Sequence, residues 1–101
     1  MIYGGTRGHV FAIDPATGAE RWRTKLSTGF LFNVAYAGDV MVMATERIII
    51  AGCNGHVWGL DPRSGEIRWH NGLGGLGNGA VTLSTEGMSI QYVHKHTQSN
   101  S

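Results

Sequence analysis

Histidine, tryptophan and asparagine side chains offer most of the chemistry in this 101-residue sequence. An aromatic face beside amide and imidazole groups suits a sugar-binding site, because the ring packs on apolar C–H groups while the polar groups bond hydroxyls. We therefore predict a ligand-binding set consisting of Asn54, His56, Trp58, His70, Asn71 and Asn78. Structural roles compete with this prediction, since asparagine favours turns and Trp58 also suits a protein core.

Catalytic and metal-binding patterns are scarce in the sequence. Two of the three aspartates, Asp14 and Asp61, are explained by turns. Cys53 is the only cysteine, so we expect no internal disulfide and no cysteine-based zinc site, although Cys53 could pair between chains. His9 and His56 could together hold a metal or an anion, but surface turns explain them better. We expect no enzymatic activity, no cofactor and no metal site.

The composition is that of a folded and nearly neutral chain. Eight Lys and Arg against seven Asp and Glu give a net charge of +1, so we expect no nucleic-acid partner. Glycine accounts for 16 residues and proline for 2, which indicates many tight turns. The sequence shows no signal peptide and no apolar run long enough to span a bilayer. We expect a soluble protein without membrane insertion, and the sequence leaves its compartment open.

An internal repeat organises the chain. Residues 9–22 align without a gap on residues 56–69, with His, Val, Asp, Pro, Gly, Arg and Trp recurring at an offset of 47. Self-similarity at a fixed period is typical of repeat architectures. A weaker echo relates residues 44–46 to residues 84–86 at a spacing of 40. We expect two tandem units, about 1–47 and 48–95, and a polar, disordered tail at 96–101.

Short β-strands joined by turns account for each unit, and no segment shows the apolar period of a helix. The predicted strands are 2–4, 10–14, 19–25 and 40–45 in the first unit, and 48–51, 57–61, 66–70 and 79–84 in the second. Asn54-Gly55 is a strong hairpin signal. Residues 88–95 are expected to open a third unit. The predicted fold is all-β and consists of four-stranded antiparallel meanders.

Both copies of the repeat carry a motif that resembles a known signature. Ala12-x-Asp14-x-x-Thr17-Gly18-x-x-x-Trp22 resembles the tryptophan-docking motif of quinoprotein-type (PQQ-like) β-propeller blades. The second copy departs from it at Gly59 and Ser64. The resemblance implies that each tryptophan packs on the glycine-containing turn of a neighbouring blade. It thereby assigns structural roles to Asp14, Thr17, Gly18, Trp22, Asp61, Ser64, Gly65 and Trp69.

The resemblance also shapes the expected function. Enzymes of this family use an adjacent Cys-Cys pair and calcium ligands near a catalytic aspartate, and the sequence has no Cys-Cys pair. We expect a non-enzymatic binding module, and lectin-like carbohydrate binding is the preferred function because repeated weak sites gain avidity. The alternatives are a protein-interaction scaffold and a fragment of a larger quinoprotein dehydrogenase propeller.

Two blades would leave apolar faces exposed, whereas propellers usually have four to eight blades. The chain is therefore expected to be a fragment of a longer propeller or to close a ring with copies of itself. For the ring we expect a homo-oligomer of three or four copies, with four preferred. Strand exchange would place residues 88–95 of one copy beside residues 2–4 of the next.

Overall fold

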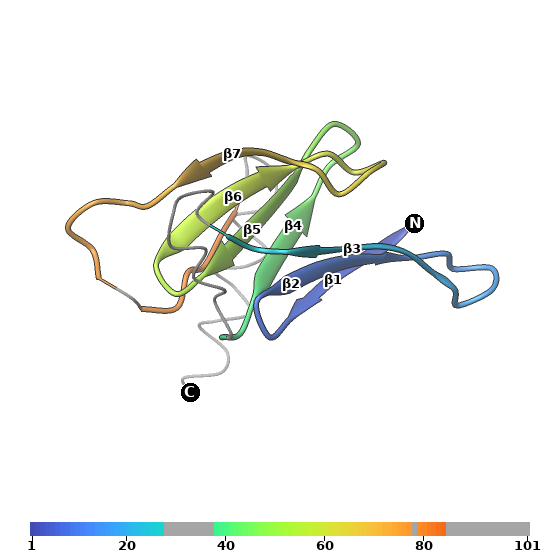
Figure 1. The fold of residues 1–101 in the computed structure, drawn as a ribbon, viewed down its shortest axis with the longest axis horizontal. Helices are drawn as coiled ribbons and strands as arrows, with labels where there is room; N and C mark the ends of the chain where they lie inside the picture. The colour runs from blue at the N-terminus through green and yellow to red at the C-terminus, as the bar shows by residue number, and fades with distance from the viewer. Residues whose placement is uncertain (28–37, 78, 85–101) are drawn as a thin grey trace.

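The computed structural model describes residues 1–27, 38–77 and 79–84 and arranges them as two antiparallel β-sheets (Figure 1). The first sheet has the order β1-β2-β3 and the second the order β4-β5-β6-β7. The strands are β1 (Ile2–Thr6), β2 (His9–Ile13), β3 (Glu20–Lys25), β4 (Met41–Ala44), β5 (Ile49–Cys53), β6 (His56–Leu60) and β7 (Ile67–Asn71). These residues include no helix that could cross a membrane. The predicted all-β fold of antiparallel meanders is confirmed.

Tight turns join the first two strands of the repeat in both sheets. Arg7 and Gly8 have φ values of 49° and 71°, and Asn54 and Gly55 have values of 48° and 80°. Two consecutive left-handed residues are the mark of a type I′ turn, whose twist matches that of the flanking strands. The predicted Asn-Gly hairpin is therefore confirmed. Arg7 fills the same position in the first sheet, although arginine tolerates this backbone region less well than asparagine.

The hydrophobic core lies between the two sheets. Along β2, Val10 and Ala12 are completely buried and face the second sheet, while Phe11 faces the opposite way because strand side chains alternate. The other completely buried side chains are Leu26, Ile49, Ala51, Cys53, Trp58 and Leu60. Burial raises the pKa of the Cys53 thiol above its usual value. A disulfide between copies would therefore require local opening of this core.

The sheet boundaries differ from the sequence repeat by one strand. We expected residues 40–45 to complete the first unit, but β4 pairs with β5 and belongs to the second sheet. A hairpin explains this pairing: the Thr45 amide and hydroxyl both donate to the carbonyl of Ile48. Closing this short loop loses little chain entropy, whereas pairing with the first sheet would close a longer one. The first sheet consequently has three strands rather than the predicted four.

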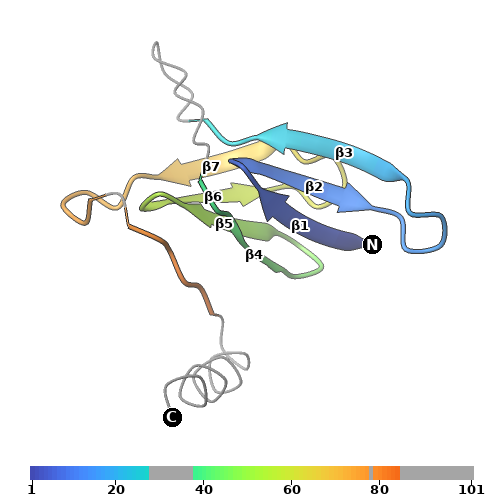
Figure 2. The same cartoon turned by 90° about the horizontal axis from the view of Figure 1, so that it is seen from below.

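Residues 79–84 do not form the strand predicted for them. They follow the loop that leaves β7 (Figure 2), and Val81 and Leu83 come close to Gly52 of β5. A Cβ atom on Gly52 would lie 2.7 Å from Val81 Cβ, as one on Gly5 would lie 2.8 Å from Val40 Cβ. Val81 thus lies against the second sheet as Val40 lies against the first, and no strand among the described residues pairs with residues 79–84. The predicted segments 88–95 and 96–101 lie outside the described residues.

Candidate functional site

The two histidines of the predicted ligand set meet on neighbouring strands of the second sheet. His56 Nδ1 on β6 and His70 Nε2 on β7 lie 2.7 Å apart, a hydrogen-bond distance. Their rings are nearly parallel, with centroids 5.0 Å apart and an interplanar angle of 12°. The Trp58 ring lies 5.7 Å from His56 and 5.2 Å from His70. Cross-strand pairing of Trp58 with His70 brings the three rings together.

One proton must serve the bond between the histidines, because one ring donates and the other accepts. When both rings are protonated, both facing nitrogens carry hydrogens, and repulsion between two imidazolium ions replaces this bond. Burial, and then electrostatic interaction with the neighbouring His56 ring, lower the pKa of His70 below its usual value. The arrangement favours a neutral His70 near pH 7.

Acidification should therefore destabilise the fold. His70 binds its proton more readily in the unfolded chain, so stability falls as the pH drops below about 6.5 towards the lowered pKa of the folded state. We expect the melting temperature to fall by about 2–5 °C more between pH 7.5 and pH 5 in the natural chain than in His70→Gln. Thermal unfolding followed by circular dichroism measures this difference. His9→Gln is the matched control and should keep the full pH dependence. Equal slopes in His70→Gln and the natural chain would contradict the assignment.

The three predicted asparagines have different surroundings. Asn71 is exposed, and its Oδ1 accepts a hydrogen bond from the Leu73 amide at 2.8 Å. Asn54 sits in the β5–β6 turn with its amide group against Gly38, where a Cβ atom would lie 2.6 Å from Oδ1. Asn78 lies outside the described residues. The turn and loop roles that competed with ligand binding therefore explain the first two asparagines.

Trp58 is completely buried and serves the core. Its Nε1 donates a hydrogen bond of 2.7 Å to the carbonyl of Ser27, just beyond β3. The indole is therefore held between the two sheets, and no face of it is open to a sugar ring. His56, His70 and Asn71 remain accessible at its edge, so the set offers polar groups without the aromatic platform that motivated the prediction.

At the opposite ends of the strands, the repeated turns have the same hydrogen bonds in both copies. Asp14 Oδ1 accepts from the Ala16 amide and Asp61 Oδ1 from the Arg63 amide, both at 2.8 Å. Each aspartate also forms an ion pair with an arginine of the next strand. Arg68 Nη2 lies 2.8 Å from Asp61 Oδ2, and Arg21 Nη1 lies 3.5 Å from Asp14 Oδ2. The pKa of Asp61 is lowered, mainly by the Arg63 amide and then by Arg68. The recurring aspartates thus hold turns, as the sequence predicted.

Trp22 joins the first sheet to the second at these turns. Its Nε1 donates to the carbonyl of Pro62 at 3.1 Å, and Thr24 Oγ1 donates to the carbonyl of Gly65 at 2.6 Å. Gly65 is buried, and a Cβ atom there would lie 2.7 Å from Trp22 Cδ2. The turn residue must therefore be glycine for the indole to approach. Trp69, the equivalent of Trp22, is 42% exposed.

The comparison with protein families agrees with these repeated turns. A family model described as outer membrane protein assembly factor BamB matches residues 1–98. The chain belongs to this family. The resemblance to PQQ-like β-propeller repeats inferred from the sequence is thereby confirmed. Comparisons with curated proteins and with solved structures found no match.

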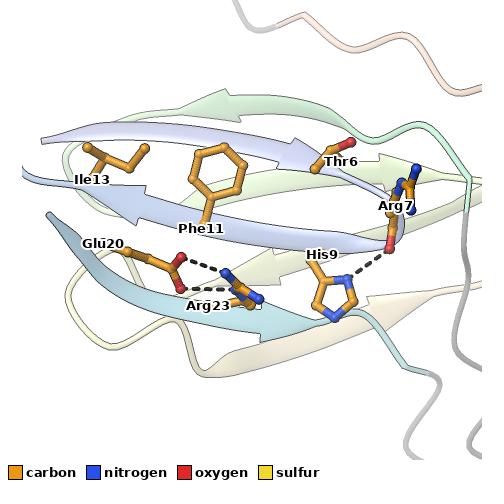
Figure 3. Close-up of a pocket in the computed structure, with 7 residues that line it drawn as sticks. All are labelled: Thr6, Arg7, His9, Phe11, Ile13, Glu20 and Arg23. Carbon is orange, nitrogen blue, oxygen red and sulfur yellow. Dashed lines mark hydrogen bonds and ion pairs between the residues drawn. The ribbon is translucent and has the colours of Figure 1, made fainter. Parts of the chain in front are cut away.

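The outer face of the first sheet of this BamB-family chain is hollowed by a cavity of about 420 Å³ (Figure 3). Phe11 and Ile13 give it apolar walls, and Glu20 and Arg23 form an ion pair of 2.7 Å on one side. Hydrogen bonding to Arg23 lowers the pKa of Glu20. The remaining lining residues are Thr6, Arg7 and His9.

The predicted ligand set did not include this cavity. The repeat itself contained the relevant signal, because Phe11 occupies the position of Trp58. Phe11 therefore lies on the face of the first sheet that is equivalent, in this BamB-family repeat, to the face of the second sheet buried against the first.

Proposed function

We propose that this chain is part of a non-catalytic β-propeller scaffold that binds a protein partner in outer membrane protein assembly. Membership of the BamB family carries the proposal. The binding surface that we propose is the histidine end, defined as the end of the strands that presents Arg7, His9, Lys25, Asn54, His56, His70 and Asn71. The opposite aspartate end is defined by the turns 14–18 and 61–65.

Comparison of the two repeat copies separates architecture from recognition. At the aspartate end, the same side chains recur and make the same turn and ion-pair contacts in both copies. Such contacts stabilise the blade and leave few groups for a partner. Asp14 and Asp61 in particular are engaged with backbone amides and arginines, which supports a scaffold over a catalytic role.

The histidine end differs between the copies. Arg7 corresponds to Asn54 in the turns, and Lys25 at the end of β3 corresponds to Gly72 just after β7. Substitution at equivalent positions of a fixed framework changes the surface chemistry without changing the fold, as in binding loops on rigid scaffolds. Polar and positively charged groups gather here, so an acidic or hydrogen-bonding protein surface is the partner that this end suits.

A cross-linking experiment tests the proposal. A photo-reactive amino acid placed at Lys25, on the histidine end, should give one discrete adduct in cells, with a component of the outer membrane assembly machinery. The same amino acid at Arg63, on the aspartate end, is the matched control because both positions are exposed basic side chains. We expect at least about tenfold less adduct at Arg63, since interfaces are confined to one patch. Absence of an adduct at Lys25, or equal adducts at both positions, would overturn the proposal.

Glycan-array binding distinguishes the lectin alternative. Carbohydrate binding that a free sugar inhibits and that His70→Gln abolishes would replace the protein-partner proposal. Quinone-dependent dye reduction would do the same in favour of a dehydrogenase propeller.

A further inference from the structure

Trp22 and Trp69 are equivalent in the repeat but have opposite surroundings. Trp22 is half-buried on the turn at Pro62 and Gly65, with its Nε1 bonded to the Pro62 carbonyl. Trp69 has no such turn to contact in the described part of the chain, and it lies over Gly59 of its own sheet with 42% of its surface exposed. The second sheet thus presents the same tryptophan as the first, but no turn in the described part of the chain packs against it.

The turns at Gly18 and Gly65 show the complementary difference. Their φ values are +77° and +78°, so the two turns have the same backbone conformation. A Cβ atom on Gly65 would collide with Trp22, whereas one on Gly18 would meet nothing within 4 Å. Pro15 is exposed where its counterpart Pro62 is partly buried. The Pro15–Gly18 turn of the first sheet, called the seat below, is therefore uncovered. It has the same geometry as the turn of the second sheet that receives Trp22.

The surfaces around the tryptophan and the seat are also matched. Ile2 is 53% exposed, although its counterpart Ile49 is completely buried between the sheets. Phe11, in the cavity of Figure 3, is the counterpart of the buried Trp58. On the other side, Leu73 is the counterpart of the completely buried Leu26. Positions that hold buried apolar side chains between the two sheets thus have accessible apolar side chains at their counterparts on the outer faces.

We propose that a second copy of this chain docks head to tail on the first, with Trp69 of one copy seated on the Pro15–Gly18 turn of the other. The contact repeats the interface between the two sheets, so Trp69 Nε1 donates to the Pro15 carbonyl as Trp22 does to Pro62. Asn71 takes the place of Thr24 at the Gly18 carbonyl. This association is independent of any partner bound at the histidine end.

A second copy fits these surfaces because one chain carries both halves of the interface. The net charge of +1 adds little repulsion between copies. Residues 79–84 support the same geometry, since Val81 lies on Gly52 as Val40 lies on Gly5. In the docked pair this segment lies beside β1 of the second copy, as β4 lies beside β5 within the chain. Such a contact is heterologous and leaves a free tryptophan and a free seat for further copies.

Sedimentation velocity on the full chain over roughly 1–200 µM tests the proposal, because reversible association changes the sedimentation coefficient with concentration. We expect association in the natural chain and a weakening of about 30-fold or more in Trp69→Ala, the effect of removing a buried interface tryptophan. Ile2→Asp places a charge on the seat side and should weaken association similarly. Leu76→Ala is the matched control, because Leu76 is 74% exposed and lies outside both surfaces.

Mixing the variants tests the head-to-tail arrangement directly. Trp69→Ala retains the seat and Ile2→Asp retains the tryptophan, so the mixture should form a one-to-one complex that neither variant forms alone. A natural chain that stays monomeric or unfolded over the whole range would overturn the proposal and leave these faces to flanking blades of a longer propeller. Unchanged association in Trp69→Ala, or no complex in the mixture, would also overturn it.

Discussion

Gly65→Ala is expected to destabilise the chain by about 3–5 kcal/mol, whereas Gly18→Ala should cost about 1–2 kcal/mol. Both glycines have φ near +78°, so alanine suffers the same backbone strain at either position. Only Gly65 lies beneath Trp22, and a methyl group there would force the indole away from the Pro62 carbonyl. Urea unfolding followed by tryptophan fluorescence measures both losses.

The comparison is cleanest in a Trp69→Ala background at one fixed chain concentration, because association would otherwise stabilise the folded state. In that background the difference between the two variants isolates the packing of Trp22 on its turn. Equal losses at the two positions would show that backbone strain alone requires glycine, and that Trp22 does not hold the sheets together.

Trp58→Ala should destabilise the fold by about 3–5 kcal/mol, because it empties the largest completely buried side chain in the described core. Trp58→Phe should lose only about 1–2 kcal/mol, since the ring is largely kept while the carbonyl of Ser27 loses its donor. Phenylalanine at the equivalent position of the first sheet, Phe11, indicates that the strand accepts this residue. Denaturant midpoints of the three proteins provide the measurement.

Trp69→Ala is the matched control for this series. Its side chain is 42% exposed, so in dilute solution its removal should cost less than about 1 kcal/mol. If Trp58→Ala were as mild as Trp69→Ala, the core assignment of Trp58 would be wrong, and its prediction as a ligand-binding aromatic would regain its basis.

Local chemistry made most strands and turns predictable. Residues 57–61 were expected to be a strand, and β6 spans His56–Leu60. The Asn54-Gly55 turn followed from the preference of these residues for positive φ. Asp14 and Asp61 were correctly assigned to turns because a short carboxylate can accept from an amide two residues later.

Long-range pairing was the part that the sequence left open. The period of the repeat suggested that residues 40–45 close the first unit, but a repeat has no intrinsic starting point along the chain. Hydrogen bonding through the Thr45–Ile48 hairpin decided that β4 joins the second sheet. Residues 79–84 were predicted as the fourth strand of the second unit, yet a strand also needs a neighbour, and the fold places Val81 against Gly52 instead.

The sequence by itself determined the all-β fold, the repeat and the two aspartate–glycine turns, because these depend on contacts within a few residues or on the repeat offset in the sequence. Only the tertiary structure decided that His56 and His70 lie within hydrogen-bond distance and that Trp58 is buried while Trp69 is exposed. Equivalent residues acquire different roles because the first sheet packs on the second, and no local pattern records which copy has a neighbour on which face.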